Sequence, residues 1–95
     1  MARRNLRQWS TIFRGLANPY RLRIIELLQR NGSMSVSALT EALGITIKNT
    51  SRNLSIMQNL DILESEGRDG HVFYRLNHRL ADDIRQVLHT AVPKG

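Results

Sequence analysis

The residues whose types most clearly suggest a binding chemistry lie between positions 46 and 59, a stretch with hydrogen-bonding and cationic side chains and no acidic one. Its two cations, Lys48 and Arg52, are four residues apart and share one face if the stretch is helical. The positions expected to contact a partner are Thr46, Lys48, Asn49, Ser51, Arg52, Asn53 and Ser55. Guanidinium and amide groups pair with base edges, and short side chains allow close approach to a groove. This composition favours a helix that reads DNA over an ordinary solvated helix, which usually mixes Glu with Lys.

The segments around this stretch predict a helix-turn-helix. A helix over 36–43 begins after the N-cap Ser35 and ends at Gly44, and a second helix over about 47–60 begins after the N-cap Thr46. Asp61 follows, where the chain must turn and a left-handed backbone is tolerated. The side chains expected to face the core are those of Ile47, Thr50, Leu54, Met57 and Leu60.

The rest of the chain completes a single domain over residues 1–95, with loose ends expected at 1–4 and 93–95. Helices are predicted over 5–17 and 19–30, separated at Asn18 and Pro19, and Met34 can lie in a short strand. Strands over 62–66 and 71–77 flank a hairpin loop at 67–70, and a helix over about 80–91 ends the domain. We expect a mainly α-helical winged helix-turn-helix of order helix, helix, helix, helix, hairpin, helix.

The predicted hairpin carries Arg68 and His71 at or near its tip. A basic tip can reach a flanking groove or a phosphate, so both are included among the expected DNA contacts. The alternative is that they belong to a solvated turn.

Two apolar seams mark the first and last predicted helices. They consist of Leu6, Trp9, Phe13 and Leu16, and of Leu80, Ile84, Val87 and Leu88. Such seams are too apolar to remain exposed to solvent on so small a domain, so we expect them to join two copies in a homodimer. The alternative is that both helices pack within one chain.

The overall composition supports a polyanionic partner. The formal net charge is +6, from 14 Lys and Arg against 8 Asp and Glu. The chain has no Cys, no Gly-rich phosphate loop and no convergent acid, base and nucleophile, so we expect neither an enzyme nor a cofactor. No apolar run is long enough to span a membrane, and we expect a cytoplasmic protein.

Several segments resemble the ArsR-type winged-helix repressors. Residues 16–28 read LANPYRLRIIELL, residues 39–46 read LTEALGIT, 54–57 read LSIM and 71–76 read HVFYRL. The likeness spans roughly residues 10–78. It implies a homodimer, joined through the first and last helices, that binds an imperfect inverted repeat in double-stranded DNA.

The chain departs from that family where many members bind a metal. Ser35 and Ser37 stand at the positions of a Cys-x-Cys pair, and hydroxyls cannot replace thiolates for soft metals. Of the four zinc-ligand positions at the last helix, occupied here by His78, Leu80, Ala91 and Lys94, only His78 has a ligating side chain. If His78 and His89 share a helix face, a site would need an antiparallel partner helix and Asp82 or Asp83. We therefore predict no metal, and the sequence assigns no effector.

These observations lead to one main hypothesis and two alternatives. The main hypothesis is a sequence-specific, homodimeric, DNA-binding transcription regulator that acts as a repressor. The alternatives are a winged-helix protein-interaction module and a non-specific nucleic-acid-binding protein, because a fold does not fix a function.

Overall fold

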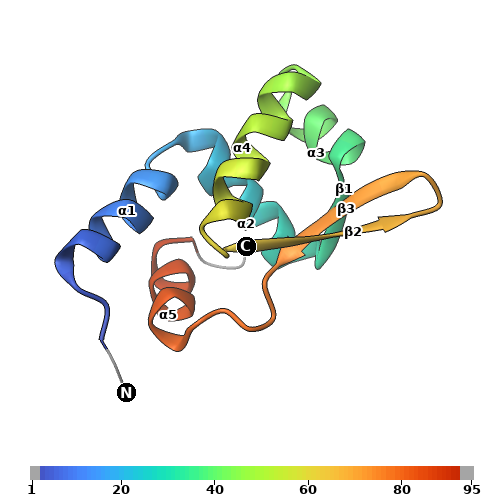
Figure 1. Ribbon diagram of the computed structural model, residues 1–95. Helices are drawn as coiled ribbons and strands as arrows, with labels where there is room; N and C mark the ends of the chain where they lie inside the picture. Colours follow the sequence, from blue (N-terminus) through green and yellow to red (C-terminus); the bar gives the residue numbers. More distant parts are fainter. Residues whose placement is uncertain (1–2, 93–95) are drawn as a thin grey trace.

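The computed structural model describes residues 3–92 of the chain. In chain order the elements are α1 (Leu6–Leu16), α2 (Pro19–Asn31), β1 (Ser33–Ser35), α3 (Val36–Leu43), α4 (Ile47–Asn59), β2 (Leu63–Arg68), β3 (His71–Leu76) and α5 (Asp82–Ala91). Figure 1 shows β2 and β3 projecting from the helical body as a wing, with α1 and α5 at the other end. The predicted order of elements and the winged helix-turn-helix fold are confirmed.

The helices begin where local capping chemistry places them. Asn5 forms a capping box with Gln8, in which each side chain accepts a hydrogen bond from the other residue's backbone N–H at 2.8 Å. Asn18 caps α2 with Pro19 at the first helical position, as predicted. Ser35 and Thr46 cap α3 and α4, also as predicted. Of the expected loose ends, residues 1–2 and 93–95 lie outside the described part of the chain.

The turn that follows α4 has the predicted left-handed residue. Asp61 has φ +59°, and its N–H donates to the carbonyl of Gln58 at 3.0 Å. The next residue, Ile62, is fully buried and its N–H donates to the carbonyl of Met57. The core that results is aliphatic, and its fully buried side chains include Ile24, Ile25, Leu39, Leu54, Met57 and Ile62.

The wing belongs to a three-stranded antiparallel sheet of order β1-β3-β2. Asp69 and Gly70 form a two-residue turn, and both have positive φ, +51° and +79°, as the turn that matches strand twist requires. The predicted four-residue loop at 67–70 is therefore wrong, because Gly67 and Arg68 are the last residues of β2. Arg68 pairs with His71 directly beside the turn.

The two apolar seams divide between the core and the surface. Leu16, Leu80, Ile84 and Leu88 are buried within the single chain, so their assignment to a dimer interface is corrected to the intramolecular core. They pack inward because α1 and α5 are amphipathic and cover the same aliphatic cluster. The exposed or half-buried members of the seams are Leu6, Trp9, Phe13 and Val87. Within residues 3–92, no helix has the length and apolar character needed to cross a bilayer.

Candidate nucleic-acid interface

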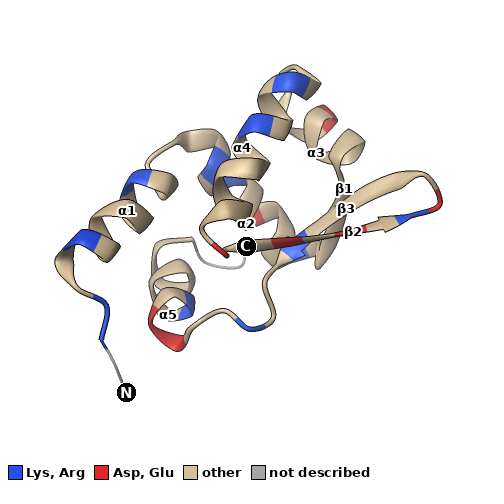
Figure 2. Cartoon of the chain, in the orientation of Figure 1, with Lys and Arg blue, Asp and Glu red and all other residues tan. Residues whose placement is uncertain are grey.

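Polar side chains form an exposed face, with no acidic residue, towards the N-terminal end of α4. Thr50, Asn53, Leu54 and Met57 form its buried stripe. The opposite surface exposes Thr46, Lys48, Asn49, Ser51, Arg52 and Ser55, which we call the reading face. Figure 2 shows the basic residues of α4 towards its N-terminal end. Neither Lys48 nor Arg52 forms an ion pair with any residue in the range 3–92.

Ile47 extends the reading face and corrects one prediction. Its side chain is 59% exposed, although the periodicity of α4 predicted that it would face the core. As the first residue of α4, it lies one turn before Thr50, where the buried stripe begins. An exposed aliphatic side chain at this place can contact the methyl group of thymine.

Asn53 is the one predicted contact that lies inside the protein. The residue is only 8% exposed, so it is not available to DNA. Its Oδ1 accepts a hydrogen bond from Arg21 Nη1 at 2.9 Å, and its Nδ2 donates to the carbonyl of Asn49 at 3.0 Å. Asn53 therefore fixes α4 against α2. Its spacing of three residues from Thr50 and four from Met57, both on the predicted core side of the helix, was the available indication.

A second set of hydrogen bonds joins α4 to the wing. Gln58 Nε2 donates to Ser65 Oγ at 3.0 Å, and Tyr74 Oη donates to Gln58 Oε1 at 3.3 Å. One residue of α4 thus contacts both strands of the hairpin. Sequence reasoning missed the roles of Gln58 and Tyr74, because residues 16 apart come together only through the turn at Asp61. The wing and the reading face are consequently held in one arrangement.

The tip of the wing carries charge of both signs. The guanidinium of Arg68 lies 4.2 Å from the centroid of the Phe73 ring, and its Nε is 3.7 Å from Glu66 Oε2. His71 packs edge-on against the same ring, and both predicted tip residues are exposed. An exposed ion pair of this length is weak, so Arg68 can exchange Glu66 for a phosphate.

The acidic residue at the base of the wing is compensated. Glu64 Oε1 lies 2.9 Å from His78 Nδ1 and accepts a hydrogen bond from Arg75 Nε at 2.6 Å. The contacts with His78 and Arg75 lower the pKa of Glu64 from 4.5 to about 2. Glu64 is therefore an anion at neutral pH, and its charge is paired with the guanidinium of Arg75 on β3.

The structure also corrects the geometry considered for a metal. His78 lies before α5, which begins at Asp82, so His78 and His89 do not share a helix face. Within residues 3–92, no group of three or more His, Cys, Asp or Glu side chains is placed to hold a metal ion. Ser35, at the position of a family cysteine, has its hydroxyl occupied in capping α3.

Comparison with known proteins identifies the family. A family model described as a helix-turn-helix domain matches residues 16–66, which run from the end of α1 into β2. The chain belongs to this helix-turn-helix domain family. No curated protein matches the chain.

Solved structures of helix-turn-helix proteins share the fold of this family member. A possible transcriptional regulatory protein from Mycobacterium bovis (fragment 1–100) is 26% identical, with coverage of 90% of this chain and 88% of that one and a TM-score of 0.75. Its solution structure is described as the homodimeric winged helix-turn-helix DNA-binding domain of a possible ArsR-family regulator (24% identity, 96% and 86% coverage, TM-score 0.75). Rv0081 from M. tuberculosis is 25% identical over 95% and 87% of the chains, with a TM-score of 0.78. The transcriptional repressor PagR of Bacillus anthracis is 17% identical over 90% and 94%, with a TM-score of 0.74. The resemblance to ArsR-type winged helix-turn-helix regulators is confirmed.

Proposed function

We propose that two copies of this chain bind double-stranded DNA as a homodimer and repress transcription from an imperfect inverted repeat. The observation that carries the proposal is the reading face of α4. It is exposed, it covers the N-terminal part of α4, and it combines hydrogen-bonding groups and no acid with two cations that form no ion pair within residues 3–92. A recognition helix uses such a face in the major groove, where its N-terminal half meets the base edges.

The side chains of the reading face suit different contacts. Arg52 can donate two parallel hydrogen bonds to guanine, and Asn49 can pair with adenine. Lys48 offers a point charge to a phosphate. The wing, fixed to α4 through Gln58, would bring Arg68 and His71 to the flanking backbone.

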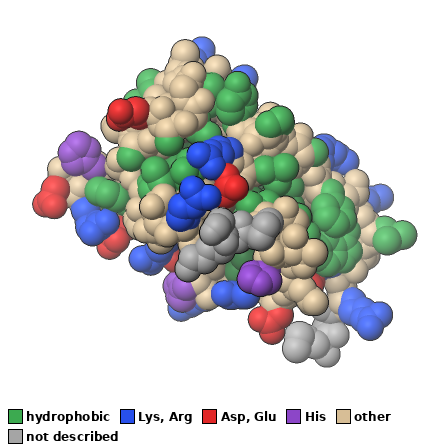
Figure 3. Space-filling model, turned by 180° about the vertical axis from the view of Figure 1, so that it is seen from behind, with side chains coloured by type: hydrophobic (Ala, Val, Ile, Leu, Met, Phe, Trp, Pro, Cys, Tyr) green, Lys and Arg blue, Asp and Glu red, His purple; other side chains and the backbone are tan. Residues whose placement is uncertain are grey.

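The remaining apolar surface of α1 and α5 supports the homodimer. Leu6 is 87% exposed, Phe13 is 51% exposed, and the Phe13 ring stacks on Trp9 with 5.5 Å between centroids. Figure 3 shows green side chains open to solvent at the end of the molecule away from the wing. A two-fold dimer joined there carries two reading faces, and such symmetry matches an inverted repeat. The M. bovis relative is a homodimer and PagR is a repressor, which agrees with both parts of the proposal.

Selection of bound duplexes from a random pool with the full chain tests the proposal. We expect an enriched motif with two inverted half-sites. On that motif, replacing Arg52 by alanine should weaken binding by about 1–3 kcal/mol, as expected for a base contact, and replacing Lys48 by alanine should weaken it less, as expected for a phosphate contact. Arg30→Ala is the matched control, because Arg30 is exposed on the side of α2 opposite Arg21 and α4.

Three outcomes would contradict the proposal. Enrichment of no motif, with equal affinity for any duplex or for RNA, would indicate a non-specific nucleic-acid-binding protein. Absence of any salt-dependent DNA binding would favour a protein-interaction module, since phosphate contacts always make affinity fall as salt rises. Unchanged affinity in both Arg52→Ala and Lys48→Ala would refute the role of α4.

A further inference from the structure

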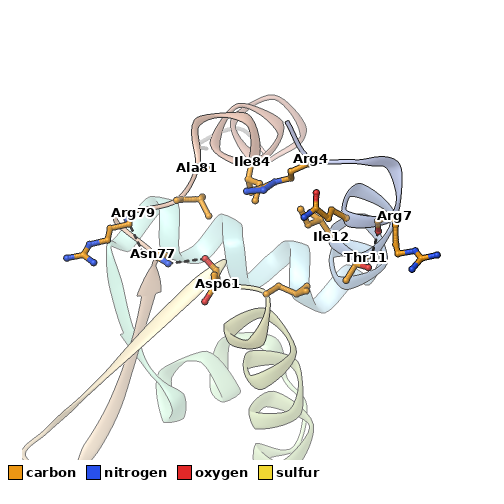
Figure 4. A pocket seen from close by; sticks show the side chains of 12 residues that line it. Arg4, Arg7, Thr11, Ile12, Asp61, Asn77, Arg79, Ala81 and Ile84 are labelled. Carbon is orange, nitrogen blue, oxygen red and sulfur yellow. Dashed lines mark hydrogen bonds between the residues drawn. The ribbon is translucent and has the colours of Figure 1, made fainter. Parts of the chain in front are cut away.

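A cavity of about 530 Å³ opens between α1, the turn after α4 and the segment that leads into α5 (Figure 4). Ligand pockets commonly have volumes of this order. Its apolar wall is formed by Ile12, Leu60, Leu80 and Ile84, three of which belong to the buried core. The cavity plays no part in the DNA contacts proposed above.

The cavity faces away from the proposed dimer seam. Arg7 and Thr11 line it, whereas the rings of the seam belong to Trp9, which is half-buried, and Phe13, which is exposed. Each ring follows a lining residue by two positions, which on an α-helix turns the side chain about 160° away. A homodimer joined through Trp9 and Phe13 therefore leaves this side of α1 open.

The charges around the cavity are mostly positive. Arg4, Arg7 and Arg79 line it against the single carboxylate of Asp61. Figure 4 shows Arg79 on one side of the opening and Arg7 on the other, each with its guanidinium directed away from the cavity, so that a change of rotamer is needed to turn either one towards a ligand. Within residues 3–92, neither forms an ion pair. Arg4 Nε lies 3.4 Å from Asp83 Oδ2 but is buried without forming a hydrogen bond. A buried N–H normally donates to an acceptor, so the Nε–H of Arg4 is a donor that still lacks its hydrogen-bond partner.

We propose that the cavity binds a small organic anion with an apolar body, such as an aromatic carboxylate. The aliphatic wall would contact the apolar body. Arg7 or Arg79, rotated towards the opening, would hold the anionic group, because guanidinium and carboxylate form paired, charge-assisted hydrogen bonds. A neutral molecule of the same shape would lose that second contribution.

The position of the cavity gives such a ligand a regulatory role, and this part rests on the proposed DNA binding. Leu60 and Asp61, which directly follow α4, line the cavity together with α1 and with the residues before α5. Asn77 Nδ2 donates to the carbonyl of Asp61 at 3.1 Å across its floor. A ligand seated here touches the end of the reading helix and both helices of the proposed dimer face.

Nuclear magnetic resonance titration of the full chain with 2-naphthoate, and separately with the neutral 2-naphthamide, tests the site. We expect 2-naphthoate to shift the backbone amides of Thr11, Asp61 and Ala81, and to bind at least about tenfold more tightly than 2-naphthamide. Shifts confined to Leu6 and Phe13 would place the probe on the dimer seam and overturn the proposal. Equal affinity of the two probes, or no binding of either, would also overturn it.

Charge-removing variants supply the matched comparison. Arg7→Gln with Arg79→Gln should weaken 2-naphthoate binding by about tenfold or more, while leaving 2-naphthamide unaffected. Arg23→Gln with Arg30→Gln removes the same charge from the exposed face of α2 and should change neither. An equal loss in both double variants would mean that only net charge matters, which would refute the site.

A competition with DNA separates this inference from the proposed function. Saturating 2-naphthoate should change the affinity for the selected operator, and operator should change the affinity for 2-naphthoate by the same factor. If the probe binds the cavity and operator affinity stays constant, the regulatory part is wrong and the site stands. If the chain binds no operator, the proposed function fails, and the two probe titrations still decide the site.

Discussion

Replacement of Phe13 by alanine should separate the two copies of the chain and leave each copy folded. The residue is 51% exposed, and within residues 3–92 its ring stacks on no aromatic ring other than that of Trp9, which lies on the same helix. Truncation therefore removes little from the core, where the fully buried side chains come from other elements. In the proposed homodimer, by contrast, the exposed half of each ring is withdrawn from water.

The expected loss can be worked from that exposure. An aromatic side chain carries roughly 200 Å² of surface, so each Phe13 offers about 100 Å² to a partner and the dimer buries about 200 Å². At about 25 cal/mol per Å² this contributes roughly 5 kcal/mol, or about 4 kcal/mol once the alanine Cβ is retained. Because about 1.4 kcal/mol is tenfold, the dimer Kd should rise on the order of 1000-fold.

Sedimentation equilibrium over a concentration series measures this change directly, with circular dichroism to confirm the fold. Tyr20→Ala is the control, because Tyr20 is an aromatic residue of similar exposure, 44%, on α2. We expect Tyr20→Ala to associate like the unsubstituted chain and Phe13→Ala to sediment as a monomer. Equal dimer Kd values for the three proteins would show that α1 does not form the interface.

Two further predictions concern residues that support the reading face. Asn53→Ala leaves Arg21 without its acceptor and should lower the free energy of unfolding, measured in urea, by about 1–3 kcal/mol. Asn49→Ala is the control and should change that free energy little. A larger loss in Asn49→Ala than in Asn53→Ala would refute the positioning role of Asn53. Glu64 has a folded pKa of about 2 against 4.5, so its contribution is complete above about pH 4.5 and is lost as the pH falls towards 2. The stability difference between the unsubstituted chain and Glu64→Gln should therefore shrink over that range, and a difference independent of pH would contradict the assignment.

The ends of the elements were predictable because they depend on neighbouring residues. Asn18, Ser35 and Thr46 each accept a hydrogen bond from an N–H two or three residues ahead, so chemistry within one turn decides where the helix begins. Asp61 takes the expected left-handed backbone for a similarly local reason. The N-cap at Asn5 was missed by one residue, since the prediction included that residue in the helix.

The orientation of individual side chains depends on tertiary packing and was harder to predict. Asn53 and Asn49 are the same residue type on the same helix, yet one pairs with Arg21 and the other faces solvent. Leu16 and Phe13 both belong to the apolar seam of α1, but only Leu16 reaches the core. Periodicity gives the apolar stripe of a helix, and the neighbouring elements decide how much of its width is covered.

The contacts around α4 argue that the reading face and the dimer seam behave as one rigid unit. A Cβ added to Gly15 would lie 2.1 Å from Leu60 Cδ1, so α1 packs against the end of α4 at a distance that only glycine permits without movement of Leu60. From α2, Arg21 holds the middle of α4 through Asn53. Because α1 also carries the dimer seam, the separation of the two reading faces follows from how α1 meets its partner. Leu60 also lines the cavity, so a ligand that displaces Leu60 would change the contact between α1 and α4. A changed contact would alter the separation of the two reading faces. The cavity is therefore well placed to change operator affinity without touching DNA.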